Sequence, residues 1–72
     1  MTHDRIEINP DIMVGKPVIN GTRIPVDMIL RKLGAGIPIE EILEDHPHIT
    51  REDIRAVQAF AAGSISKEAA AG

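Results

Sequence analysis

No cysteine occurs in the 72 residues of this chain, and that absence limits how so short a chain can stabilise a fold. A domain of this length buries only about 60% of the surface that its unfolded chain exposes. Short domains usually compensate with disulfides, a structural metal or oligomerisation. Disulfides and thiolate metal sites are excluded here. We therefore expect one small domain that is supported by a homodimer contact.

Charge is distributed unevenly along the chain, although the net charge is only −3. Residues 1–36 carry five basic and four acidic side chains, whereas residues 37–72 carry three basic and seven acidic ones. Because DNA affinity depends on neutralising phosphates, only the first half is a good candidate to contact a duplex. The alternative, that these bases are ordinary solvated surface charges, stays open. The candidate DNA-binding residues are Lys16, Arg23, Arg31 and Lys32.

The segment before residue 25 has the pattern of short strands and turns. Residues 5–8 alternate polar and apolar side chains, which indicates an edge strand. Asn20-Gly21 is the dipeptide preferred in two-residue type I′ loops, so we predict a hairpin that pairs residues 17–19 with residues 22–24. An isolated hairpin is only marginally stable, so it must pack on helices or pair with another chain.

Beyond residue 25, apolar residues recur at helical spacing and predict three short helices. The first ends at Gly34, the second runs from Pro38 to the break at His46-Pro47-His48, and the third follows Thr50 and ends at Gly63. The expected inward residues are Val26, Ile29, Leu30 and Leu33, then Ile39, Ile42 and Leu43, then Ile54, Val57, Phe60 and Ala61. The predicted fold class is mainly α, a helix-turn-helix-like three-helix bundle preceded by a short strand and a β-hairpin.

The domain organisation follows from these elements. We expect one domain over residues 1–63, with the hairpin in about residues 5–24, and a flexible tail over residues 64–72 in which residues 67–71 can extend as helix. Thr50 is a good N-cap that Asp53 can answer in a capping box. Asp27 and Arg31 are four apart on the first helix and can form an ion pair.

No pattern in the chain predicts catalysis or a cofactor. Gly15-Lys16 resembles the end of a phosphate-binding loop, but Pro17 stands where that loop needs Ser or Thr. Asp45, His46 and His48 share one loop, yet ligands so close together rarely converge on a metal, so we expect none. The chain has no signal-peptide pattern and no apolar run that approaches a membrane span, so we expect a cytoplasmic protein that is not an enzyme and makes no membrane contact.

One stretch of the chain resembles a known family. Its core is Gly15-Lys16-Pro17 with Asn20-Gly21-Thr22-Arg23, followed by Leu33-Gly34-Ala35-Gly36 and Asp45-His46-Pro47. This pattern closely resembles the domain-of-unknown-function family 433, over about residues 3–62. The resemblance implies a short prokaryotic protein with a homeodomain-like three-helix fold. It also implies a VapB-type antitoxin, which pairs with a PIN-like ribonuclease toxin and binds operator DNA as a dimer.

Two positions depart from that family pattern. Ile37 stands where relatives often place a capping residue before Pro38, which leaves the second helix poorly capped. The third helix, which would read DNA in a homeodomain-like module, opens Arg51-Glu52-Asp53 after an acidic second helix. We therefore expect the basic first half, not the third helix, to make any DNA contact. The competing hypothesis is a dimeric protein-interaction module with no role at nucleic acid.

Overall fold

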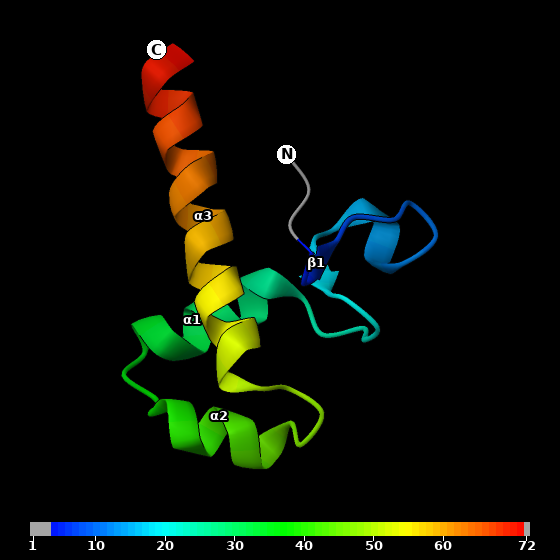
Figure 1. Cartoon of the computed structure of the whole chain (residues 1–72), viewed down its shortest axis with the longest axis vertical. Coiled ribbons are helices and arrows are strands. Elements are labelled where there is room, and N and C mark those ends of the chain that lie inside the picture. The colour runs from blue at the N-terminus through cyan, green and yellow to red at the C-terminus, as the bar shows by residue number, and fades with distance from the viewer. Residues whose placement is uncertain (1–3, 72) are drawn as a thin grey trace.

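The computed structural model describes the backbone of residues 4–71 and the side chains of residues 4–66. In Figure 1, α3 is the long vertical helix, α1 and α2 lie at its N-terminal end, and β1 lies to one side of them. The predicted mainly α architecture, with three helices after a small antiparallel sheet, is confirmed. In chain order the elements are β1 (Ile6–Glu7), the 3-10 turn η1 (Met13–Gly15), β2 (Val18–Ile19), α1 (Val26–Gly34), α2 (Ile39–Asp45) and α3 (Arg51–Ala71).

The core lies where the three helices and the sheet meet, and it is built almost entirely of aliphatic side chains. Most of the buried side chains form one cluster that draws on both strands and all three helices, so the helices are stabilised mainly by packing on one another and on the sheet. The predicted aromatic core residue, Phe60, packs half-buried at the edge of this cluster. The buried cluster comprises Ile6, Ile19, Val26, Ile29, Ile42, Ile49, Ile54, Ala56 and Val57.

The first two helices follow the predicted pattern with one shift at α2. In α1, Val26 and Ile29 are buried and the helix ends at Gly34 as expected. In α2, Pro38 is the N-cap with extended backbone and not the first helical residue, so the predicted start is one residue early. No side chain caps α2, because its N-cap is Pro38, and Ile37 before it packs against the core.

The third helix begins as predicted and ends later than predicted. The Thr50 hydroxyl accepts from the Asp53 N–H at 3.2 Å, and the Asp53 carboxylate accepts from the Thr50 N–H at 3.0 Å, which is the predicted capping box. The predicted stop at Gly63 is wrong, because the helix continues to Ala71. Gly63 is not among the glycines with positive φ, so it does not form a left-handed C-cap, and its cost inside a helix is only about 1 kcal/mol.

The sheet has a different pairing from the one predicted. β1 and β2 are antiparallel, with Ile6 opposite Ile19 and Glu7 opposite Val18. On the other side of β2, Val18 is opposite Pro25 in an isolated bridge. β2 is therefore the central segment, and both of its residues are buried. No helix of the described chain combines the length and hydropathy needed to cross a membrane.

The turn after β2 is type II with a four-residue connection, so the predicted two-residue type I′ loop is wrong. The Thr22 N–H donates to the Ile19 carbonyl at 3.0 Å, and Gly21, the third residue of this turn, alone in it has positive φ, at 79°. The Ile19 N–H donates to the Ile24 carbonyl at 3.0 Å, so residues 20–23 form the connection. The cause is Thr22. Its hydroxyl donates to the Ile19 carbonyl at 2.7 Å and accepts from the Ile24 N–H at 3.0 Å, so a side chain occupies the place of a backbone ladder bond.

Candidate functional site

Two of the four predicted DNA-binding residues meet on one exposed face around Asp27. Lys16 Nζ lies 3.5 Å from Asp27 Oδ2, and Arg31 Nη2 lies 2.7 Å from the same oxygen. The Asp27–Arg31 pair is the one predicted from helical spacing. The Val26 N–H donates to the Pro17 carbonyl at 2.9 Å, which holds the Lys16 segment against the first turn of α1. Two cations sharing one carboxylate leave this face with a net charge of +1.

The other two predicted DNA-binding residues, Arg23 and Lys32, form no ion pair with Asp27 in the described structure. Arg23 is exposed in the connection that follows the type II turn, and the structure shows no ion pair for it within residues 4–66. Lys32 is half-buried and its Nζ lies 3.8 Å from Asp45 Oδ2, at the end of α2. Lys32 therefore links two helices, whereas Arg23 keeps an unneutralised charge that a phosphate can meet.

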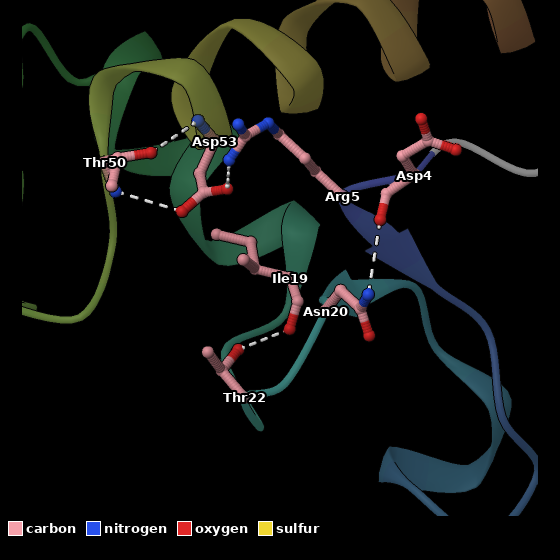
Figure 2. Close-up of polar contacts among 7 residues, drawn as sticks. All are labelled: Asp4, Arg5, Ile19, Asn20, Thr22, Thr50 and Asp53. Carbon is pink, nitrogen blue, oxygen red and sulfur yellow. Dashed lines mark hydrogen bonds and ion pairs between the residues drawn. The ribbon is translucent and has the colours of Figure 1, made fainter.

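The signature residues of the sequence pattern have structural roles. Figure 2 shows Asn20, whose side-chain Nδ2 donates to the Asp4 carbonyl at 3.2 Å and ties the turn to the chain before β1. Gly15 and Gly21 both adopt positive φ, and Thr22 closes the turn with its hydroxyl. Together with Pro17, these residues fix the positions of Lys16 and Arg23 in the chain.

An ion pair that the sequence did not indicate joins the chain start to α3. Arg5 Nη1 lies 3.0 Å from Asp53 Oδ1, and Figure 2 shows the guanidinium between β1 and the first turn of α3. Asp53 is only 7% exposed, although aspartate is rarely so buried without a partner. The capping box supplies its other hydrogen bonds. Asp53 was predicted as a cap, but its contact with Arg5, 48 positions earlier, has no local sequence signal.

Electrostatics at the start of α3 follow from two such pairs. Burial acts to raise the pKa of Asp53, but hydrogen bonds from the Thr50 backbone, Arg5 and the Thr50 hydroxyl outweigh it, so the pKa lies below its ordinary value. The hydrogen bond from Arg51 likewise lowers the pKa of exposed Glu40, whose Oε1 lies 2.8 Å from Arg51 Nη2. Asp53 is thus neutralised within the fold and repels a phosphate less than the sequence alone indicated.

The second turn of α3 lines a shallow hollow of about 250 Å³ beside β1. Its floor is Ala56 and Ala59, and its rim is Arg5, Glu52 and Arg55.

The sequence predicts no metal site. Asp45, His46 and His48 share a loop, but within the described residues no three His, Cys, Asp or Glu side chains form a group able to hold a metal ion.

These features define a small helical domain whose exposed charges and hollow suit contacts with other molecules. Residues 6–61 match the model of the family described as "Protein of unknown function (DUF433)", and the chain belongs to that family. A solved DUF433 member from Anabaena variabilis has 30% identity and a TM-score of 0.82, covering 89% of this chain and 63% of that one. The expected family membership is confirmed.

Two curated proteins are also similar to this chain, and both are named only as uncharacterized. The protein y4eO of Sinorhizobium fredii is 40% identical over 53 residues, which are 74% of this chain and 24% of that protein. A protein of Archaeoglobus fulgidus is 57% identical over 28 residues, which are 39% of this chain and 78% of that protein. The chain thus matches about a quarter of the first of these relatives.

Proposed function

We propose that this protein is an antitoxin-type regulator that works in the cytoplasm as a homodimer, through binding and not through catalysis. Its partners in this proposal are operator DNA and a protein toxin of the PIN-like ribonuclease class. The observation that carries the DNA part is the cationic surface of the first half, where Lys16 and Arg31 converge on one carboxylate and Arg23 is exposed nearby in the chain. Such a surface suits contacts with phosphates.

The sheet contributes to this proposal because it fixes where Arg23 lies. The type II turn fixes the connection that carries Arg23, so this guanidinium lies on the surface of the domain. In contrast, Arg51 at the start of α3 is held by Glu40 at 2.8 Å. A phosphate would have to displace that carboxylate before it could contact Arg51.

We predict that Arg23→Ala weakens binding to duplex DNA and lowers the slope of log affinity against log salt by about one, because one phosphate contact is lost. The double variant Lys16→Ala/Arg31→Ala, which removes both cations of the face around Asp27, should weaken binding as well. Fluorescence anisotropy with a host operator-region duplex, at about 50 and 200 mM salt, measures both quantities.

Arg51→Ala is the matched control, since it removes a guanidinium from the position where a recognition helix would contact bases. It should change the affinity and the salt slope little. If Arg51→Ala instead weakens binding more than Arg23→Ala, α3 is the reading element and the first half is not. If the wild type does not bind duplex DNA at low salt, the DNA part of the proposal is wrong.

The partner-protein part of the proposal draws support from exposed apolar side chains. Ile8 is 54% exposed and Ile65 is 68% exposed, so both apolar side chains are available to pack against a partner protein. We predict that tagged protein expressed in its own host co-purifies with a PIN-like ribonuclease and suppresses RNA cleavage when added to it. A ribonuclease that binds the protein but stays fully active would contradict the antitoxin role.

A second candidate function is a protein-interaction module without a role at nucleic acid. One observation favours it. Five basic side chains already pair with carboxylates of the same chain, which reduces the charge available to phosphates. The anisotropy titration separates the two functions, because this module would show no salt-dependent DNA binding. The paired bases are Arg5, Lys16, Arg31, Lys32 and Arg51.

A further inference from the structure

The loop of residues 9–16, here called the Val14 loop, holds an apolar side chain in water. Val14 is 97% exposed and Met13 beside it is 38% exposed. Backbone hydrogen bonds fix the loop, from the Ile12 N–H to the Asn9 carbonyl at 2.9 Å and from the Gly15 N–H to the Ile12 carbonyl at 3.1 Å. Figure 1 shows that the loop projects from the body beyond β1. An ordered loop thus presents Val14 outward.

The backbone of this loop is strained as well as exposed. Met13, Val14 and Gly15 have φ values of 52°, 55° and 80°, in the left-handed region. That region is unfavourable for a residue with a Cβ and most unfavourable for a β-branched one such as Val14. No burial compensates for the strain, since Val14 contributes nothing to the core. Strained backbone conformations of this kind cluster at functional sites, where the exposed side chain makes a contact.

The hollow on α3 offers a surface that complements the Val14 loop. Its floor is Ala56 and Ala59, and it is an open, shallow surface against which a valine side chain can pack. On its rim, Arg55 is exposed and forms no ion pair in the described part of the chain. In the loop, Asp11 is exposed, likewise without an ion pair in the described structure. The apolar side chain of Val14 at the apex of the loop therefore matches the apolar floor of the hollow. The exposed carboxylate of Asp11 matches the exposed guanidinium of Arg55 in charge.

We propose that the occupant of the hollow is the Val14 loop of a second copy of this chain. Each copy carries one loop and one hollow, so a two-fold dimer makes the same contact twice. Val14 inserts over Ala56 and Ala59, and Asp11 pairs with Arg55 across the interface. This inference rests on the homodimer of the proposed function and names its surfaces.

Val14→Asn tests the apex of the loop. Asparagine tolerates the left-handed region, so this variant should keep or raise the thermal stability measured at a concentration where the protein is monomeric. The same variant should weaken self-association at least tenfold in sedimentation-equilibrium experiments, because the apolar insertion is lost. Ile65→Asn is the matched control, since it makes the same change at another exposed apolar side chain, on α3 and outside the proposed contact, and should leave self-association unchanged.

A charge exchange tests the pairing. Asp11→Arg and Arg55→Asp should each weaken self-association, and the two changes combined in one chain should restore it. If the wild type stays monomeric at protein concentrations up to about 1 mM, its dissociation constant is weaker than about 1 mM. That result would overturn both this inference and the homodimer of the proposed function. If the wild type dimerises and the Val14→Asn and Arg55→Asp variants dimerise with the same affinity, only this inference is overturned, because another surface then forms the dimer.

Discussion

Ile29→Ala should destabilise the fold by about 2–5 kcal/mol, the cost of removing a large aliphatic side chain from a packed core. Ile29 is 0% exposed and belongs to the single cluster in which α1 packs with the other helices and the sheet. A chain of 72 residues has a total stability of about 4–11 kcal/mol. The variant should therefore lose a large share of its stability, measured as the midpoint of urea unfolding followed by circular dichroism.

Ile65→Ala is the matched control for that experiment, because it makes the same chemical change at a position that is 68% exposed. It should change the free energy of unfolding by less than about 0.5 kcal/mol. Similar losses from the two substitutions would show that Ile29 is not in the cooperative core. Both variants should be compared at a protein concentration where self-association does not contribute to stability.

The helices were predictable because local rules determine them. The apolar spacing of α1 and the capping box at Thr50 and Asp53 are short-range signals, and both appear in the structure. The end of α3 was not predictable from Gly63, because glycine is tolerated inside a helix at a cost of about 1 kcal/mol, whereas the end of α1 is followed by a left-handed glycine, Gly36, with a φ of 84°. That choice depends on the residues that follow and on what they contact, not on glycine itself.

The sheet was less predictable because its pairing is non-local. Asn20-Gly21 correctly indicated a turn, but the Thr22 hydroxyl selected type II over type I′. β2 then takes its main partner from residues 6–7 across a long loop, an arrangement that neighbouring residues do not encode. Strand register in so short a sheet is decided by which side chains reach the core.

The candidate binding residues were predictable as charges but not as a constellation. Helical spacing indicated the Asp27–Arg31 pair, but nothing in the sequence indicated that Lys16 would reach the same carboxylate. The burial of Asp53 and its contact with Arg5 were also missed. Their only signal was that Asp53 directly precedes the inward residue Ile54, which places it at the edge of the buried face of α3.

Asp53→Ala is the second substitution for which we expect a large effect, a loss of about 2–3 kcal/mol in the free energy of unfolding. It removes the capping carboxylate, worth about 1 kcal/mol, and a charged hydrogen-bond partner of Arg5, worth about 1.5–3 kcal/mol before the half-exposed guanidinium is resolvated. Thr50→Ala and Arg5→Ala each remove one of these contacts and should cost less than Asp53→Ala. Urea unfolding at pH 7 measures all three.

The pH dependence of stability identifies the charge of Asp53 as the cause. Because its pKa is lowered in the folded protein, this carboxylate stabilises the fold fully above its unfolded pKa of about 3.9, and the stabilisation is lost as pH falls through the folded pKa. Asp53→Asn should therefore be less stable than the wild type at pH 7, with the difference shrinking below about pH 4. Glu40 contributes a smaller acid loss that both proteins share, so the difference between them isolates Asp53. A difference that stays constant down to pH 2 would mean that Asp53 acts by shape and not by charge.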